Sequence, residues 1–163
     1  MRSRVILKKS NSVVFVNPAY AFKTKPDLIL KVDEMWSYVG NKKRQNWLWW
    51  VEDAFTGNIV AFTFGRRSNA TFMRLKKIMA GAGIMADLWI TDRWGTYQTC
   101  LDPSERMENK GALQSLERKH LTLRTRIKRL TRKTICFSKS IVIHNTLIAL
   151  FINHYFFGLN QHV

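Results

Sequence analysis

Three carboxylates of the sequence stand where acidic side chains can converge. Asp33 closes the apolar stretch "LILKV", Asp92 closes "LWIT", and Glu117 heads a basic segment after which no Asp or Glu occurs. Residues at the carboxyl ends of strands in α/β sheets face a crevice in which ligands collect. If the two strands are neighbours, we expect the three side chains to place their oxygens within about 8 Å of one point, the span that two bridging ions need.

Such a set of acids has a definite chemistry. Converging carboxylates repel one another unless cations lie between them, and oxygen ligands suit Mg²⁺ or Mn²⁺. Two such ions about 3.5–4 Å apart activate a nucleophile and stabilise the leaving oxygen of an in-line phosphoryl displacement. The alternative is structural, because Asp at a strand end is often a turn former or helix cap, and Glu117 could be an exposed pairing residue.

Composition indicates a folded protein with a polyanionic partner. The chain has 163 residues, 46% hydrophobic residues, six Trp and a formal charge of +16, from 27 Lys and Arg against 11 Asp and Glu. Apolar content of this size excludes a disordered polycation, and such a charge favours binding to phosphates. The most apolar span, Ile141 to Leu159, is interrupted by two His and two Asn, so no membrane span is expected.

Two further observations concern the location of the protein in the cell and the binding of zinc. Lys8 and Lys9 interrupt any signal-peptide core, and we expect a cytoplasmic protein that acts on the bacterial nucleoid. Cys100 and Cys136 are far apart and outside any CxxC pair. We therefore expect two reduced thiols and no zinc site.

The order of elements predicts a mixed α/β fold. Residues 1–27 are basic and weakly patterned, and we interpret them as an arm or a remnant ahead of one domain, residues 28–163. That domain shows a strand ending at Asp33, a hairpin over 46–65 with its turn at Thr56 to Asn58, and a helix that Ser68 or Asn69 can cap and that closes at Gly81. A strand over 86–92, a polar loop over 101–111, a basic helix and a more apolar helix from about Ile141 follow. The first three strands should be antiparallel and the fourth parallel, with helices flanking the sheet.

Strand periodicity assigns side chains to faces. In the first strand one face takes Leu28, Leu30 and Val32, and the other takes Ile29, Lys31 and Asp33. In the hairpin Trp47, Trp49 and Val51 should alternate with Leu48, Trp50 and Glu52.

The basic helix should pack on the sheet through a stripe of Leu113, Leu116, His120, Leu123, Ile127 and Leu130. Glu117 and Arg124 are seven residues apart, almost two turns, and so point nearly the same way. A carboxylate there could bind a metal while the guanidinium binds a phosphate. His120 lies in the stripe, so we expect it to be packed. For His144 and His154 core, surface and DNA-contact positions all stay open.

The basic face predicts contacts with DNA phosphates, although a merely solvated face is the alternative. The residues concerned are Arg118, Lys119, Arg124, Arg126, Lys128, Arg129, Arg132 and Lys133.

Three long stretches carry a resemblance to a known family. They are "VDEMWSYVGNKKRQNWLWWVEDAFTGNIVAFTFGRRS", "LWITDRWGTY" and "LERKHLTLRTRIKRLTRKTICFSKS". From about Leu28 to Tyr155 the chain resembles the transposase of the insertion-sequence family IS-one. The resemblance implies a DDE transposase with a ribonuclease-H-like fold, in which Asp33, Asp92 and Glu117 are catalytic and bind two Mg²⁺ or Mn²⁺ ions.

The resemblance also implies partners and a mechanism. Arg124 corresponds to the basic residue seven positions after the Glu, and Glu34 is excluded both by the motif and by the pleat. The substrate would be double-stranded DNA, transposon ends and target, bound by a homo-oligomer. Water would cleave a strand and the freed 3′-hydroxyl would attack target DNA, without a covalent protein–DNA intermediate.

Two other functions stay open. Members of this family carry a zinc-binding and helix-turn-helix region ahead of the catalytic part, and this chain shows neither. The stretch "LDPSERMENKGALQSLE" is weak in strand character where the family has a strand. These departures suggest a partial or decaying copy that retains its three acids, and the alternative function is a DNA-binding regulator of transposition without catalysis. A nuclease of the same fold, such as a junction resolvase, is a third hypothesis.

Overall fold

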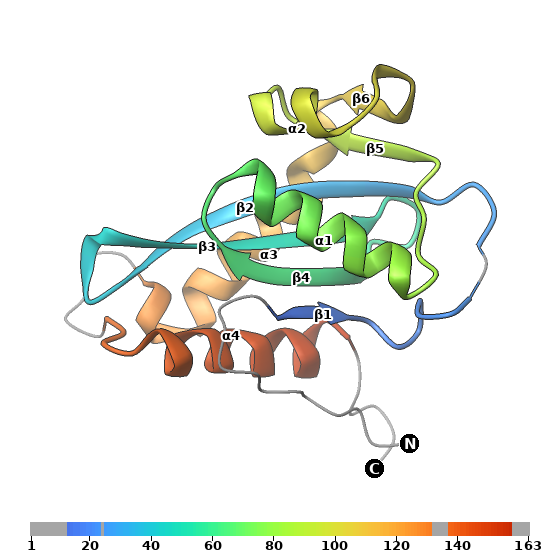
Figure 1. Ribbon diagram of the computed structural model, residues 1–163. Coiled ribbons are helices and arrows are strands. Elements are labelled where there is room, and N and C mark those ends of the chain that lie inside the picture. Colours follow the sequence, from blue (N-terminus) through green and yellow to red (C-terminus); the bar gives the residue numbers. More distant parts are fainter. Residues whose placement is uncertain (1–12, 24, 132–136, 158–163) are drawn as a thin grey trace, which may run out of the picture.

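A six-stranded mixed sheet organises the chain (Figure 1). The computed structural model describes residues 13–23, 25–131 and 137–157. In space the strands follow the order β1-β4-β3-β2-β5-β6. Their bounds are β1 Val14–Val16, β2 Ile29–Val39, β3 Asn41–Asp53, β4 Ile59–Gly65, β5 Leu88–Thr91 and β6 Arg106–Glu108. The pairs of β5 with β2 and with β6 are parallel, and the other pairs are antiparallel.

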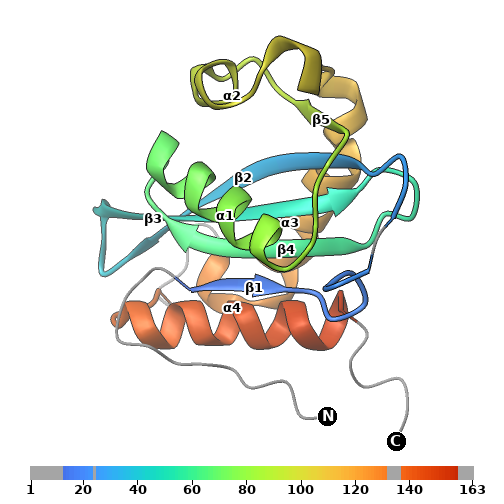
Figure 2. The ribbon, with the colours of Figure 1, turned by 45° about the vertical axis from the view of Figure 1, so that its right-hand side comes forward.

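Helices cover both faces of the sheet (Figures 1 and 2). They are α1 Asn69–Gly81, α2 Gly95–Cys100, α3 Gln114–Arg126 and α4 Ile141–Tyr155, with short 3₁₀ helices η1 Pro103–Glu105, η2 Lys110–Leu113 and η3 Lys128–Leu130. One core contains Phe72 of α1 and Tyr97 of α2. The other contains Leu123 of α3 and Ile148 of α4. The sheet therefore separates two cores.

The predicted strand faces are confirmed. Trp49 and Val51 belong to the core on the α1 side, whereas Leu48 and Trp50 belong to the core on the side of α3 and α4. Leu30 of β2 lies on the α1 side with its alternate neighbours. The hairpin turn is also confirmed, since Gly57 has φ +72, a left-handed conformation that glycine adopts without a Cβ clash.

Two strands lie where the sequence predicted none. β1 falls within the stretch that we interpreted as an arm, yet it pairs with β4, and Phe15 stacks on Phe62 with ring centroids 4.6 Å apart. β6 falls within the predicted polar loop and pairs with β5. Both are three-residue edge strands, too short to show a period-two pattern.

Two elements differ in extent from the prediction. β2 continues six residues beyond Asp33, which therefore lies inside the strand rather than at its end. α3 ends at Arg126, where the sequence predicted a basic helix continuing at least to Leu130. The hydroxyl of Thr131 donates to the Arg124 carbonyl at 3.0 Å, which satisfies one of the carbonyls that a helix end leaves open and turns the chain back.

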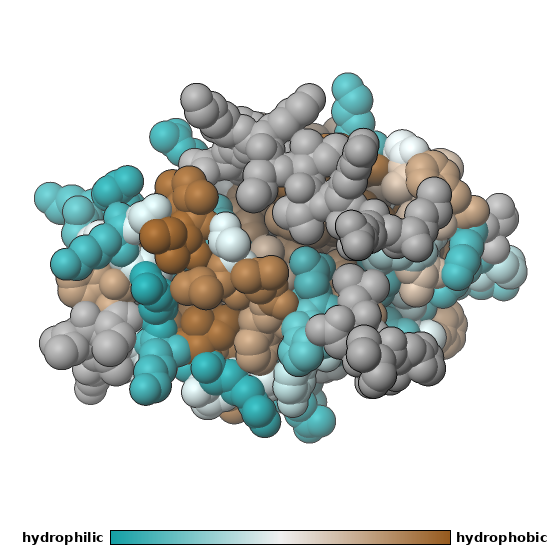
Figure 3. Space-filling view, turned by 90° about the horizontal axis from the view of Figure 1, so that it is seen from below, coloured by the Kyte–Doolittle hydropathy of each residue, from teal (hydrophilic) through white to brown (hydrophobic). Residues whose placement is uncertain are grey.

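α4 buries one side and exposes the other. Its outer side chains Val142, Ile143, Leu147 and Leu150 are all exposed. The view from below in Figure 3 shows hydrophobic side chains gathered on this face of the molecule. No helix within the described ranges has both the length and the apolar character needed to cross a lipid bilayer.

A buried ionic cluster holds α3 against the sheet. Glu52 of β3 is fully buried and lies opposite Lys31 of β2 in the ladder. The Lys31 ammonium donates to Glu52 at 3.2 Å and to the Ser115 hydroxyl of α3 at 3.0 Å. Ser115 and Lys119 of α3 both donate to the Glu52 carboxylate. This carboxylate therefore joins two strands and one helix.

We expect Glu52→Ala to lower the free energy of unfolding by about 3–5 kcal/mol, because two partly buried ammonium groups lose their counter-charge. Urea denaturation at pH 7 measures this loss. The matched control is Glu105→Ala, since Glu105 pairs with Lys76 where both side chains are about a third exposed or more. That control should lose less than about 1 kcal/mol. Equal losses for the two variants would contradict the proposed importance of the cluster.

Candidate active site

Asp33 lies on β2, and Asp92 lies one residue beyond the end of the neighbouring strand β5. The parallel ladder of β2 and β5 ends with the pair Lys31 and Ile90. Asp33 lies two residues beyond Lys31 (33 − 31 = 2), and Asp92 lies two residues beyond Ile90 (92 − 90 = 2). The adjacency expected from the sequence is thus present. β5 stops at Thr91 while β2 continues, so the two acids stand where the strands part.

Asp33 lies in an unfavourable electrostatic environment for a carboxylate. Burial is the main cause that raises its pKa from 3.8 to about 7, and the neighbouring Glu34 charge is the next. The backbone N–H of Glu34 donates to Oδ1 at 2.9 Å and opposes the shift. Asp92 and Glu117 both raise the pKa further. The three predicted acids therefore share one electrostatic neighbourhood.

Glu117 reaches this neighbourhood from the first turn of α3. It is three residues before His120, or about 60° around the helix from it. The His120 ring lies 3.8 Å from the Asp33 carboxylate, measured from Nε2 to Oδ2. Within the described ranges no three acidic, histidine or cysteine side chains are gathered as closely as ligands of one metal ion.

His120 is a packed, neutral side chain. Its Nε2 accepts a hydrogen bond from Trp50 Nε1 at 2.8 Å, and the two rings stack with centroids 5.2 Å apart. Burial, followed by the charge of Arg124, lowers its pKa to about 3. The ring therefore gives Asp33 no positive counter-charge, in agreement with the packed position expected from the sequence.

The structure also places the histidines that the sequence left open. His144 is buried and bonds to the hydroxyls of Ser37 and Ser138 at 2.9 and 2.7 Å. Burial, followed by the charge of Arg129, lowers its pKa to about 4. His144 is thus a core residue, and His154 is exposed.

Glu34 lies on the opposite face of β2 from Asp33, as the pleat predicted. Its carboxylate accepts from Arg67 Nε at 2.6 Å and from the Tyr97 hydroxyl at 2.7 Å. Burial, followed by the charge of Glu34, raises the pKa of Tyr97 well above its ordinary value. The Tyr97 hydroxyl thus stays protonated and serves as a donor to Glu34.

Arg67 connects this face to the second acid. Its guanidinium lies 4.1 Å from the centre of the Trp94 ring, and the Trp94 backbone N–H donates to Asp92 Oδ1 at 2.9 Å. Contacts therefore run from Glu34, beside Asp33, through Arg67 and Trp94 to Asp92. Sequence reasoning missed Arg67 and Trp94, although "GRRS" and "DRWG" flank the elements concerned.

The predicted basic residues have different surroundings. Lys119 is held by Glu52, and Arg126 lies over the Tyr155 ring at 5.3 Å. Arg124 and Arg129 line a pocket. Arg118 and Lys128 are exposed. Arg132 and Lys133 lie outside the described residues, as does Cys136, while Cys100 is a free thiol.

Comparison with known proteins gives consistent matches. The sequence model of the IS1 transposase family matches residues 27–158. The chain is 43% identical over 130 residues to the insertion element iso-IS1n protein InsB of Shigella dysenteriae, covering 80% of this chain and 98% of that protein. It is 37% identical over 127 residues to the insertion element IS1 protein InsB of Shigella sonnei, covering 77% and 95%.

A solved structure shares the fold. A chain of the simian T-cell lymphotropic virus intasome in complex with PP2A regulatory subunit B56 gamma matches with a TM-score of 0.55 and 18% identity. The match covers 80% of this chain and 49% of that one, so the chain spans about half the length of its structural neighbour. The fold is the ribonuclease-H-like mixed sheet expected from the sequence.

The raised pKa of Asp33 predicts how stability depends on pH. The folded state binds a proton at Asp33 more tightly than the unfolded chain does, so the free energy of unfolding should fall as pH rises from about 4 to 7. The total loss should be up to about 4 kcal/mol, at about 1.4 kcal/mol per pKa unit. Asp33→Asn should therefore be more stable than the wild type at pH 8 in EDTA, and the difference should vanish near pH 4.

Urea denaturation at several pH values checks this dependence. Asp27→Asn, which replaces an exposed carboxylate, is the matched control and should leave the pH profile unchanged. A wild-type stability that does not fall between pH 4 and 7 would contradict the environment described for Asp33.

Proposed function

Since the chain belongs to the IS1 transposase family, we propose that it cleaves DNA strands at the ends of an insertion sequence and joins them to target DNA. The reaction is a metal-dependent phosphoryl transfer in which Asp33, Asp92 and Glu117 are the catalytic acids. The observation that carries this proposal is the position of Asp33, two residues past the ladder of β2 with β5 as Asp92 is, with a pKa raised first by burial and further by both other acids.

The three acids suit Mg²⁺ or Mn²⁺. Their donor atoms are all carboxylate oxygens, which these ions prefer. Asp33 is a partly buried carboxyl that its acidic neighbours disfavour as an anion, and a divalent cation would remove that penalty. Asp33, Asp92 and Glu117 would hold two ions, whose chemistry in such sites is to polarise the phosphate and activate the attacking oxygen.

Residues around the acids hold each of them in place. The backbone N–H of Glu34 bonds to Asp33, and that of Trp94 bonds to Asp92. Glu117 lies between Ser115 and Lys119, which are both anchored on Glu52. Catalytic acids need such support, because a displacement of about 1 Å can cost two orders of magnitude in rate.

The basic residues after Glu117 bind the DNA backbone. Arg118, Arg124, Arg126, Lys128 and Arg129 lie on α3 and η3, in sequence beside the acid. A net charge of +16 adds long-range attraction to phosphates. Lys119 has a different task, because its ammonium is bound to Glu52.

The partners proposed are double-stranded DNA, as transposon ends and target, and further copies of the chain. A structural neighbour is a chain of an intasome. α4 contains no Lys, Arg, Asp or Glu, and its outer face is apolar. On a molecule of such high positive charge this is the surface where two copies can approach without charge repulsion. The place of action would be the nucleoid of a bacterial cell.

Removing one catalytic acid should abolish chemistry but leave DNA binding. With Mg²⁺ and duplex DNA that carries the inverted repeats flanking the gene, the wild type should cleave and join strands. Asp92→Asn and Glu117→Gln should lower the rate by orders of magnitude, and should bind DNA as tightly as the wild type or more tightly. Gel analysis of the products measures the rate. The surface variant Glu105→Gln should retain full activity, and a wild type that binds DNA without cleaving it would favour the regulator instead.

Removing exposed cations near Glu117 should reduce the salt dependence of DNA binding. Lys128→Ala should lower the slope of log affinity against log salt by about 0.9, and the double variant with Arg118→Ala by about twice as much. Fluorescence anisotropy in EDTA measures this without cleavage. Lys77→Ala, an exposed position on α1 across the sheet, is the matched control. A slope that falls equally in the control would refute a DNA surface along α3.

A further inference from the structure

The ladder between β2 and β5 ends before it reaches the two aspartates. Its last pair is Lys31 with Ile90. Asp33 and Asp92 each lie two residues further along the chain. β5 has stopped at Thr91, so that Asp92 lies in the connection to α2. Backbone pairing therefore does not fix Asp92 against Asp33, and side chains have to supply that restraint.

Four side chains form a closed set of contacts across this gap. The Glu34 carboxylate accepts from Arg67 Nε at 2.6 Å and from the Tyr97 hydroxyl at 2.7 Å. The Arg67 guanidinium lies 4.1 Å from the centre of the Trp94 ring. The rings of Trp94 and Tyr97 meet edge to face, with centroids 5.7 Å apart. Each of the four side chains therefore contacts two others, and we call this set the four-residue bridge.

The backbone of the four-residue bridge holds both aspartates. The backbone N–H of Glu34 donates to Asp33 Oδ1 at 2.9 Å. The backbone N–H of Trp94 donates to Asp92 Oδ1, also at 2.9 Å. Because these two amides bind the two carboxylates, the spacing of Glu34 and Trp94 bears directly on the spacing of the acids.

Arg67 is the member of the bridge that comes from a separate part of the chain, between β4 and α1. The Glu34 side chain is only 2% exposed, and its carboxylate fixes the guanidinium over the Trp94 ring. A planar guanidinium covers an aromatic face in a way that an ammonium does not. A second bond joins the same segments, from the Thr96 hydroxyl to Asn69 Oδ1 at 2.6 Å. The start of α2 is therefore held on the start of α1.

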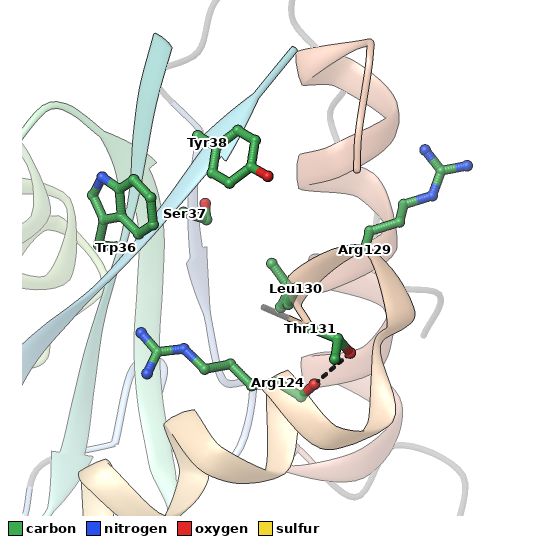
Figure 4. A pocket seen from close by; sticks show the side chains of 7 residues that line it. All are labelled: Trp36, Ser37, Tyr38, Arg124, Arg129, Leu130 and Thr131. Carbon is green, nitrogen blue, oxygen red and sulfur yellow. Dashed lines mark hydrogen bonds between the residues drawn. The ribbon is translucent and has the colours of Figure 1, made fainter. Parts of the chain in front are cut away.

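Two other arginines approach β2 at a different place. Arg124 and Arg129 line a pocket with Trp36 and Tyr38, farther along the strand than Asp33 (Figure 4). Arg67 instead meets β2 at the residue next to Asp33.

We propose that Arg67 is a positioning residue that joins Glu34 to Trp94 and thereby sets the distance between the Asp33 and Asp92 carboxylates at which a divalent cation binds. The inference rests on the proposed function and adds to it a residue outside the three acids. Arg67 acts in this role through its neighbours, without touching DNA or metal. Replacing residues that support metal ligands typically changes metal affinity or activity by about 10- to 100-fold.

Amide hydrogen exchange in EDTA, followed by NMR, tests the restraint without metal or cleavage. Arg67→Lys keeps a cation for Glu34 but loses the planar group that covers Trp94. The Trp94 amide should then exchange about 2- to 30-fold faster, the factor that one cation–π contact supplies. The Asp87 amide bonds to the Leu28 carbonyl at the other end of the same strand pair and should be unchanged.

Binding of Mn²⁺ measures the consequence for the acids. Asp92→Asn should lose this binding, which identifies the site. Arg67→Lys should bind Mn²⁺ about 10- to 100-fold more weakly than the wild type and lower kcat by a similar factor, with KM for DNA unchanged. Arg67→Gln decides by the sign of its effect. Removal of a positive charge should by itself tighten the binding of a cation, whereas lost positioning should weaken it.

Two further variants complete the design. Trp94→Leu removes the other half of the contact and should act like Arg67→Lys. The effects of the two should not add in the double variant, because both break one contact. Lys25→Gln is the matched control, since Lys25 lies 3.6 Å from the centre of the Tyr20 ring, whose hydroxyl bonds to the Asp53 carboxylate. It should leave Mn²⁺ affinity and cleavage unchanged.

The outcomes separate this inference from the proposed function. Wild-type Trp94 exchange and Mn²⁺ affinity in Arg67→Lys would overturn the inference and leave the function intact. The same two results with a lower stability in urea would make Arg67 only structural, and with a lower DNA affinity would make it a phosphate contact. A wild type that binds no Mn²⁺ would overturn the metal-dependent function and this inference together.

Discussion

The buried carboxylate of Glu52 is the contact on which the position of the helix α3 depends. It lies in the central part of the sheet and accepts from Ser115 and Lys119, four residues apart on α3. Two anchors one turn apart fix both the rotation and the translation of a helix. With α3 so fixed, Glu117 and Arg124 have definite positions along the strand that carries Asp33. A buried ion pair contributes little net stability, and its value here is that it specifies one arrangement.

The pleat of β2 places the structural acid Glu34 and the proposed catalytic acid Asp33 on opposite faces of the strand. Asp33 and Glu34 are consecutive, and both are disfavoured as anions by burial. On the α1 side, hydrogen bonds from Arg67 and Tyr97 stabilise the charged form of Glu34 and offset the effect of burial. Among the residues that the structure describes, Asp33 has no equivalent partner on its own side, where the neighbouring His120 is neutral. A buried carboxyl group whose pKa is raised and whose charge is not compensated is typical of a functional position.

Local patterns in the sequence were sufficient to predict the helices and strands that are long enough to show a periodic pattern of apolar residues. The alternation of Trp49 and Trp50 identified the faces of β3, and the apolar spacing identified α1 and α4. β1 and β6 escaped prediction because three residues cannot show a period. Glu52, Arg67 and Trp94 escaped for another reason. Arg67 meets Glu34 across 33 positions and Lys119 meets Glu52 across 67, and no local pattern predicts which distant charges will pair. The three acids were proposed from motif and spacing, whereas the electrostatic environment of Asp33 required the structure.

The distribution of acids also explains why so basic a protein can contain an acidic site. Glu34, Glu52 and Asp53 are all buried and bonded to partners inside the protein. The cations Lys31, Lys119 and Arg67 are bound to two of these acids, so the net charge of +16 stays with the rest of the protein, and phosphates are attracted to it from a distance. At the point where β2 and β5 part, Asp33 and Asp92 make the local charge negative. In the function proposed above, a DNA strand guided there by the cations of α3 would meet repulsion only at the acids. A metal cation among the acids would remove their repulsion of the DNA phosphates, and DNA phosphates beside α3 would in turn favour binding of the cation. The two binding events would therefore favour each other.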